Sequence, residues 1–328
     1  MVFVLRWTGL DSVPAGFGPS VVAFGIFDGV HRGHQQVLRQ VVAQARAHRA
    51  QAVAVTFDPH PSTVHHPDQA AEAIAPLDYR LDLIEALGID ATLVIPYTAA
   101  FAATSAEGFA TKVLANTLGA RAVIVGNDLR FGRGNAGDLT TLRTLATRLG
   151  FEVHTVNDVG PSPGSESRRW SSTHVRALLA QGDLEEAALI LGRAHRVSAR
   201  VIVGDGRGRA LGFPTANLGT PVGGMIPADG LYAGWLHVPP LGACPLPAAI
   251  SVGTNPTFGG RDRRVEAHAI GRTDLDLYGE VVACDFTVRL RRTLRFATPD
   301  ALVDQMTEDV EAALAALRAR PQPPVDPC

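Results

Sequence analysis

Residues 21–34 read Val-Val-Ala-Phe-Gly-Ile-Phe-Asp-Gly-Val-His-Arg-Gly-His, and this stretch decides the fold. Its first seven residues are uncharged and almost entirely apolar, which predicts a strand over 21–27 in a parallel sheet covered on both faces. The glycines allow a sharp backbone turn after the strand. The amphipathic residues 33–50 then predict a helix. A strand, a glycine-containing turn and a helix in this order predict a βα unit with a ligand at the helix N-terminus.

The same alternation continues to residue 156. Further helices are predicted at 78–87, 105–118 and 138–149, and further strands at 52–57, 91–95, 122–125 and 151–156. Strands of this length separated by helices predict a doubly wound α/β fold, Rossmann-like, with a parallel sheet and helices on both faces. Prolines and a glycine at 161–164 predict a surface loop. Helices are then predicted to start at 171–173 and at 183.

The pattern changes after residue 191. Gly- and Pro-rich turns, without helices between them, separate predicted strands at 195–203, 231–236, 248–252, 265–270 and 281–290. This pattern is typical of a small antiparallel β-barrel. A C-terminal helix is predicted over 298–317, because Thr298 can cap it and Pro299 suits its first position. With 328 residues, we expect two domains, at 1–184 and 185–318, and a flexible tail at 319–328.

Composition narrows the classes of protein that this chain can be. With 46% hydrophobic residues and a formal net charge of −2, it reads as an ordinary globular protein, and its charge predicts no nucleic-acid or membrane partner. Lys112 is the only lysine and does not follow a glycine-rich loop, which excludes a P-loop site. Three scattered cysteines predict neither a disulfide framework nor a metal knuckle. The sequence has no signal-like segment and no run of about 20 apolar residues, so we expect a cytoplasmic protein.

Two histidines at the start of the first predicted helix are candidates for catalysis. His31 and His34 are three residues apart and fall on one side of its first turn. Their imidazoles could donate hydrogen bonds to an α-phosphate as charge builds up in a transition state. The alternative is that the pair binds a metal or faces solvent as helix caps. The strand, turn and helix in register favour the catalytic interpretation.

The segment F-G-x-F-D-G-x-H-x-G-H, residues 24–34, resembles the HxGH signature of the nucleotidyltransferase superfamily, in the form typical of bacterial bifunctional riboflavin kinase/FAD synthetases. The segments at 56–61, 125–132 and 171–176 follow in the order of that family. The resemblance implies catalysis by His31 and His34. It further implies ATP and FMN binding by Gly25, Phe27, Asp28, Gly33, Asp58, Asp128, Arg130, Ser171, Ser172, Thr173 and Arg176. One departure is Leu129, where the family usually has an aromatic residue.

A second glycine-rich segment occupies residues 203–217, between two predicted strands. Its amides could wrap phosphates. Thr215 and Asn217, two residues apart on one face of an extended chain, offer neutral oxygens that suit Mg²⁺ bound together with ATP. A plain glycine-rich hairpin is the alternative that composition alone leaves open.

The string G-x-x-x-G-R-x-L-G-F-P-T-A-N within this segment resembles the signature of the riboflavin kinase family. The resemblance implies that ATP and riboflavin are bound by Gly204, Gly208, Arg209, Gly212, Phe213, Pro214, Thr215, Asn217 and Arg291. It also implies that Glu266, in a V-E-x-H segment, is the general base for the riboflavin hydroxyl. Gly271 and Arg272 replace the acidic–aromatic pair that is usual in that family.

Together the two motif sets predict a bifunctional enzyme that phosphorylates riboflavin to FMN and then transfers AMP from ATP to FMN, giving FAD and pyrophosphate. Mg²⁺ is the expected cofactor, and ATP, riboflavin and FMN are the expected partners. One alternative is a nucleotidyltransferase whose barrel only binds substrate. The other is a flavin sensor or storage protein without catalysis. Loss of Thr215, Asn217 or Glu266 would favour the first alternative, and loss of His31, His34 or Glu266 would favour the second. All of these residues are present.

Overall fold

The computed structural model describes residues 4–157, 170–204, 206–242, 244–254 and 263–320. The predicted loop at 161–164 and the predicted tail from residue 321 on lie outside the described residues. The chain forms two compact units. The first comprises Met1–Ala73 and Leu77–Ser171, and the second comprises Ile74–Pro76 and Ser172–Cys328.

The first unit is built on a six-stranded parallel sheet with the order β1-β4-β3-β2-β5-β6. The strands are β1 (Leu5–Thr8), β2 (Ser20–Phe24), β3 (Gln51–Asp58), β4 (Ala91–Pro96), β5 (Ala120–Gly126) and β6 (Glu152–Val156). The predicted parallel sheet is therefore confirmed. β1 was not predicted, because only Trp7 of its four residues is buried and an edge strand of this kind leaves no apolar pattern.

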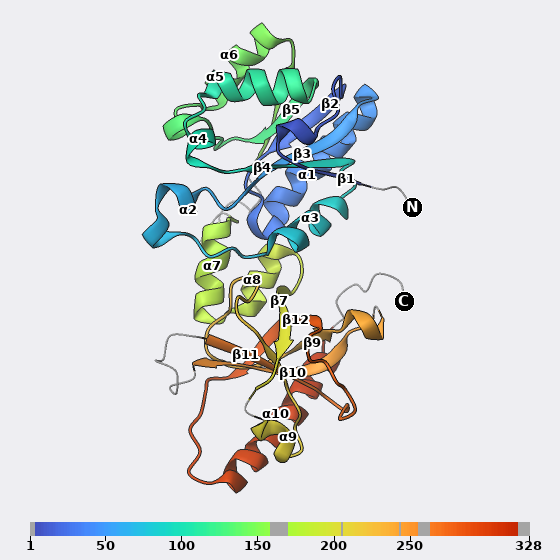
Figure 1. Cartoon of the computed structure of the whole chain (residues 1–328), viewed down its shortest axis with the longest axis vertical. Coiled ribbons are helices and arrows are strands. Elements are labelled where there is room, and N and C mark those ends of the chain that lie inside the picture. Colours follow the sequence, from blue (N-terminus) through green and yellow to red (C-terminus); the bar gives the residue numbers. More distant parts are fainter. Residues whose placement is uncertain (1–3, 158–169, 205, 243, 255–262, 321–328) are drawn as a thin grey trace. The chain divides into compact units, whose positions relative to one another are not determined.

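Helices cover both faces of this sheet (Figure 1). The helices of one face are α1 (Arg32–His48) and α3 (Leu77–Glu85), and those of the other are α5 (Ala106–Phe109), the π-helical η4 (Ala110–Thr117) and α6 (Leu139–Leu149). Side chains of β2 alternate between the two cores: Val21 and Ala23 pack with α1, and Val22 and Phe24 pack with α5 and η4. Shorter helices at the strand ends are α2 (Ser62–His65) and α4 (Ala99–Ala102).

The second unit begins with two helices, α7 (Ser172–Gln181) and α8 (Leu184–Leu191), and continues as a closed barrel with the order β10-β11-β8-β7-β12-β9. The barrel strands are β7 (His195–Ile202), β8 (Ala216–Leu218), β9 (Gly230–His237), β10 (Leu246–Thr254), β11 (Arg263–Ala269) and β12 (Val281–Arg291). All of its strand pairs are antiparallel, which confirms the prediction. α10 (Pro299–Arg318) packs across β9, β10 and β12 with its buried Ala313 and Leu317 (Figure 1).

Two short elements of this unit were not predicted. α9 (Arg207–Ala210) is a single turn inside the glycine-rich segment, and β8 has three residues. Elements this short carry no measurable hydrophobic period. β8 nevertheless pairs with β11 on one side and β7 on the other, so it is the strand that closes the barrel. Among the described residues, no helix is long and apolar enough to cross a membrane.

A buried ionic group joins three strands of the barrel. The Asp285 carboxylate on β12 is 3% exposed and accepts hydrogen bonds from Arg196 of β7, at 2.5 and 2.7 Å, and from His237 of β9, at 2.8 Å. Burial raises the pKa of Asp285, but the hydrogen bonds from Arg196 and His237 outweigh burial, and the net pKa is lowered. The carboxylate is therefore ionised at neutral pH.

Asp285→Asn should destabilise the barrel by about 3–5 kcal/mol at pH 7, because it leaves the Arg196 guanidinium without its carboxylate. A carboxyl whose folded pKa is lowered stabilises the protein above the unfolded pKa of about 3.9, and this stability is lost as pH falls through the folded value. The difference in unfolding free energy between the unsubstituted chain and Asp285→Asn, measured by urea denaturation, should therefore shrink below about pH 4. A difference that stays constant from pH 7 to pH 3 would contradict this assignment.

Candidate active sites

The loop between β2 and α1 has an unusual backbone. Phe27, Gly29 and Val30 have φ angles of 51°, 72° and 40°. Positive φ is rare for phenylalanine and rarer for a β-branched residue, and each such residue costs on the order of 1–3 kcal/mol. Residues in this conformation persist only where their surroundings hold them, and they concentrate at functional sites. The loop carries the predicted residues Gly25, Phe27 and Asp28 directly to His31.

His31 and His34 stack on each other at the start of α1. Their ring centroids are 3.7 Å apart with an interplanar angle of 21°, and the rings of Phe27 and His34 form a T-shaped contact. The backbone N–H of His34 donates to Nδ1 of His31 at 3.4 Å, so His31 caps the helix. Because Nδ1 accepts, His31 carries a proton on Nε2. Gly33 permits this fold, since a Cβ there would lie 3.0 Å from the His31 ring.

Burial lowers the pKa of His34 well below its ordinary value, and the nearby charges of His31 and Arg80 lower it further. The His34 Nδ1 atom is buried and has no hydrogen-bond partner within the described residues. His31 is itself only 7% exposed. His34 is therefore a neutral imidazole, and the stacked pair, held in one orientation, can donate hydrogen bonds to an anion at the helix N-terminus.

Other predicted residues lie at the carboxyl ends of neighbouring strands. Asp58 ends β3, and Asp128 and Arg130 follow β5, so all three lie at the sheet edge where the β2–α1 loop begins. Arg130 is 62% exposed and only 3.7 Å from Asp138. Leu129, where the family usually has an aromatic residue, packs against the core that contains Phe131.

The predicted helix at 171–173 is confirmed as α7, which begins at Ser172. Ser172, Thr173 and Arg176 lie in its first turns, and Ser171 precedes it. Ser171 belongs to the first compact unit, whereas the other three belong to the second.

In the second unit, the glycines of the G-x-x-x-G motif lie against the side chains of the T-x-N motif. A Cβ on Gly204 would lie 2.4 Å from Nδ2 of Asn217, and a Cβ on Gly208 would lie 2.5 Å from the carbonyl oxygen of Phe213 and 3.6 Å from Oγ1 of Thr215. Neither position tolerates a side chain without movement of a neighbour. The two motifs, seven or more residues apart in sequence, therefore form one structure.

Glu266 lies beside the same motif. On β11 the side chains of Val265, Ala267 and Ala269 are buried inside the barrel, so Glu266 and His268 face outward, as the alternation predicts. Glu266 is the register partner of Asn217 on β8. Directly opposed residues of an antiparallel pair have Cβ atoms about 4.5–5.5 Å apart. The carboxylate of Glu266 and the amide of Asn217 thus share one stretch of the barrel surface.

His268 joins this surface to the loop before β8. Its Nδ1 donates to the carbonyl of Pro214 at 2.7 Å, and its ring meets Phe213 edge-on with centroids 5.6 Å apart. These contacts fix the Phe213–Pro214 turn, and through it the position of Thr215.

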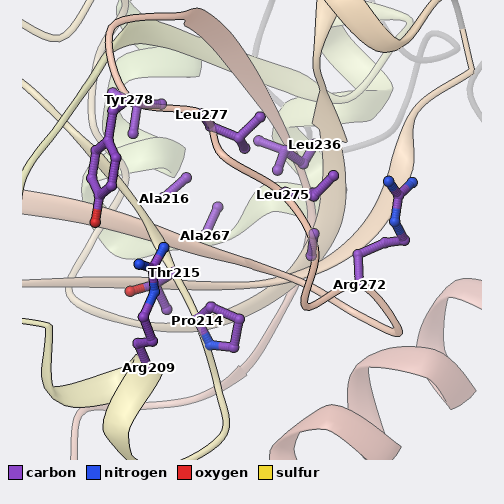
Figure 2. A pocket seen from close by; sticks show the side chains of 12 residues that line it. Arg209, Pro214, Thr215, Ala216, Leu236, Ala267, Arg272, Leu275, Leu277 and Tyr278 are labelled. Atoms are coloured by element: carbon purple, nitrogen blue, oxygen red, sulfur yellow. The ribbon is translucent and has the colours of Figure 1, made fainter.

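A pocket opens at the end of the barrel next to Thr215. Figure 2 shows Leu275, Leu277 and Tyr278, from the segment between β11 and β12, facing Arg209, Pro214 and Thr215. The Arg209 guanidinium lies 5.8 Å from the centroid of the Tyr278 ring, which is within range of a cation–π interaction. Arg272, also in the lining, is engaged by Asp274 through hydrogen bonds of 2.7 and 2.9 Å.

Two of the predicted kinase residues lie apart from these contacts. Gly212 has a φ of 88°, which only glycine adopts readily, and shapes the turn before Phe213. Arg291, at the end of β12, binds the buried Asp309 of α10 through both carboxylate oxygens, at 2.8 and 2.5 Å. Its guanidinium joins α10 to the barrel.

Sequence reasoning missed Arg80, which is 4% exposed and lies beside the first site. Its position relative to the apolar residues of the predicted helix could have indicated that it is buried. Arg80 stands four residues before the buried Ile84 on α3 and therefore on the same helix face, where a basic residue is unexpected.

Comparisons with known proteins match most of the chain. The FAD synthetase family model matches residues 15–174, and the riboflavin kinase family model matches residues 191–317. A bifunctional riboflavin kinase/FMN adenylyltransferase of Escherichia coli (strain K12) is 33% identical over 88% of this chain and 90% of its own length. One from Listeria monocytogenes is 33% identical over 93% of this chain and 92% of its own length.

Among solved structures, a Streptococcus pneumoniae protein described as a macrolide-efflux protein superposes with a TM-score of 0.83. It is 28% identical, and the match covers 95% of this chain and 99% of that one.

The geometry of the stacked histidines leads to a test by NMR. The His34 ring should stay neutral well below its ordinary pKa of 6.5, because its burial and the charges of His31 and Arg80 oppose protonation. Protonation of such a group destabilises the folded protein, so stability should fall as pH drops below about 6.5. A titration of imidazole resonances, with His34→Gln to assign the signal, measures this. A His34 midpoint at or above 6.5 would refute the assigned environment.

Proposed function

The chain belongs to the bifunctional riboflavin kinase/FMN adenylyltransferase family, and we propose that residues 1–184 transfer AMP to FMN while residues 185–318 phosphorylate riboflavin. As a member of this family it makes FMN from riboflavin and FAD from FMN. The observation that best supports the division is that each set of motif residues is gathered in a different compact unit, apart from the segment at 171–176.

In the adenylyl step, a phosphate oxygen of FMN attacks the α-phosphorus of ATP, and the bond to the pyrophosphate oxygen breaks. We assign His31 and His34 to the non-bridging oxygens of that phosphorus. Nε2 of His31 holds its proton and can donate without prior proton transfer, and the amides of the first turn of α1 add further donors. Donors that are already oriented cost no reorganisation as charge builds up.

In the kinase step, the 5′-hydroxyl of riboflavin attacks the γ-phosphorus of ATP, and ADP leaves. We assign Glu266 to accept the hydroxyl proton, because it faces outward opposite Asn217 in the barrel register. The glycine-rich loop at 204–212 would hold the phosphates through its amides. Arg209 and Tyr278, which meet over the end of the barrel, would then close around the nucleotide.

Thr215 and Asn217 are the residues that would hold Mg²⁺ in the kinase site. Nδ2 of Asn217 donates to the carbonyl of Thr215 at 3.4 Å, which leaves the amide oxygen as its ligand atom. A hydroxyl and an amide oxygen match the oxygen ligands that Mg²⁺ takes beside nucleotide phosphates. When bound, the ion neutralises charge on the transferred phosphoryl group.

The expected partners are ATP, riboflavin and FMN, not nucleic acid. Both reactions consume ATP, which supports a cytoplasmic location.

Two single substitutions test the division of activities. His31→Ala should lower FAD formation from FMN by about 10²–10³-fold, as expected for the loss of an oriented donor to a developing oxyanion. It should leave FMN formation from riboflavin unchanged. Glu266→Gln should do the reverse, lowering FMN formation by about 10²-fold or more through loss of the base.

Both proteins are assayed with ATP and Mg²⁺, each reaction separately, with flavins resolved by chromatography. Each variant serves as the folding control for the other. A loss of both activities in either variant would show that its residue is structural, and normal FMN formation by Glu266→Gln would remove Glu266 from the mechanism.

Gly204→Ala should impair the kinase without affecting FAD formation. The new methyl group would occupy the space of the Asn217 amide and displace this proposed Mg²⁺ ligand. A displacement of about 1 Å can lower the rate on the order of 10²-fold. The double variant Gly204→Ala/Asn217→Ala should then be no slower than Asn217→Ala alone, because the two changes remove the same contact. Additive losses in that cycle would argue against the contact.

A further inference from the structure

Arg80 is a buried cation that neither sequence motif includes. It is the fourth residue of α3 and is 4% exposed. Nη1 donates to the carbonyl of Ile26 at 3.1 Å, and Nη2 donates to the carbonyl of Phe57 at 3.2 Å and lies 3.6 Å from the carboxylate of Asp58. A buried charge is costly unless it is paired and hydrogen-bonded. The burial of this guanidinium therefore calls for a structural or functional explanation.

The carbonyl of Ile26 is a junction between three elements. It lies in the β2–α1 loop and accepts a second hydrogen bond, from Oγ1 of Thr56 on β3, at 2.9 Å. Arg80 adds the contact from α3. The residue after Ile26 is Phe27, where the first positive φ of the loop occurs. Gln35 of α1 holds the other end of the loop by donating to the carbonyl of Val30 at 2.9 Å.

These contacts hold the strained loop that leads to the histidines. Phe27 and Val30 would relax to ordinary φ values if the loop were released, because each stores strain. Relaxation at Phe27 would withdraw its ring from the T-shaped contact with His34 and free the stacked pair. The fork of Arg80 spans the loop and the end of β3, and it is the contact that joins the loop to α3.

We propose that Arg80 is a positioning residue for adenylyl transfer: it fixes the β2–α1 loop through Ile26 and Phe57 and places a positive charge behind His34. This inference rests on the assignment of His31 and His34 to adenylyl transfer. Arg80 is too deeply buried to touch the substrate, so it acts through the loop and the histidines. Its removal should lower the rate of the chemical step more than substrate binding.

The charge of Arg80 also bears on the protonation of His34. The charged groups around them are His31 in the same turn, Asp28 in the loop and Asp58 on β3; the two carboxylates act on Arg80. Burial, His31 and Arg80 all lower the pKa of His34. Without Arg80 the titration of His34 should shift toward higher pH, yet stay below 6.5 because burial and His31 remain.

The chain offers a matched control in Arg6, which lies on β1 and contacts the helix that carries Arg80. Arg6 forms ion pairs of 2.7 Å with Asp82 and Glu85, both on α3, and touches neither Ile26 nor Phe57. Arg6→Met therefore loosens α3 without releasing the loop. Lysine at position 80 keeps the charge and can still donate to a carbonyl, although it lacks the planar fork.

The experiment compares the unsubstituted full-length chain with the full-length variants Arg80→Met, Arg80→Lys and Arg6→Met. Arg80→Met should lower kcat for FAD formation by about 10²-fold while the KM values for ATP and FMN stay within about threefold. Arg80→Lys should keep kcat within about tenfold of that of the unsubstituted chain. Arg6→Met should have a nearly normal kcat for FAD formation. FMN formation from riboflavin is the internal reference. The His34 titration should shift upward in Arg80→Met and remain low in Arg80→Lys.

Equal losses in Arg80→Met and Arg6→Met, or an unshifted His34 titration, would overturn the inference by showing that Arg80 only anchors α3. If Arg80→Met does not fold, failure of Arg80→Lys to keep both kcat and the low His34 titration would overturn it as well. If kcat is normal in Arg80→Met while His31→Ala is impaired in FAD formation, the role of Arg80 is refuted and the proposed function stands. Normal FAD formation by His31→Ala would refute the proposed function instead.

Discussion

The parallel pairing of β2 with β3 on one side and β5 on the other is the interaction on which the first unit depends. Parallel strands end at one edge of a sheet, so the pairing brings the β2–α1 loop, Asp58 and the 126–130 segment together, although up to about a hundred residues separate them in sequence. It also requires β2 to be apolar on both faces, because each face carries a core of its own. The strand can therefore contribute no chemistry along its length, and the chemistry begins at the residues after Phe24.

The barrel brings its site residues together by antiparallel register. Its strands are antiparallel, so function follows from which residues stand opposite each other in register. β8 has three residues, yet its pairing with β11 places Asn217 opposite Glu266. The close approach of Gly204 to the Asn217 amide then joins the phosphate loop to that pair. The Phe213–Thr215 turn that leads into this short strand is held by contacts from outside it, with His268 on the Pro214 carbonyl and Gly208 against Phe213 and Thr215.

Both units use arginine to hold backbone carbonyl groups or buried carboxylates. Arg80 binds carbonyls of the β2–α1 loop and of the end of β3, Arg196 pairs with the buried Asp285, and Arg291 holds α10 through Asp309. The planar fork of a guanidinium can bind two acceptors at once, which a lysine ammonium does less well. The difference between these arginines is where they act. Arg196 and Arg291 connect elements of the barrel, whereas Arg80 reaches the strained loop that carries the histidines.

The sequence by itself determined the class of both folds, nearly every long element and the two motif sets, because these depend on local period, capping and residue type. It identified His31, His34 and Glu266 as candidates, and it placed Glu266 and His268 on one face of a strand. It missed the short elements β1, β8, α2, α4 and α9, whose few residues carry no period. It also missed Arg80, whose partners are backbone carbonyls of distant segments. Only the tertiary structure decided which residues meet: the ring stack of His31 on His34, Gly204 against Asn217, and Arg80 on Ile26. Such contacts depend on strand register and helix docking, which no local pattern encodes.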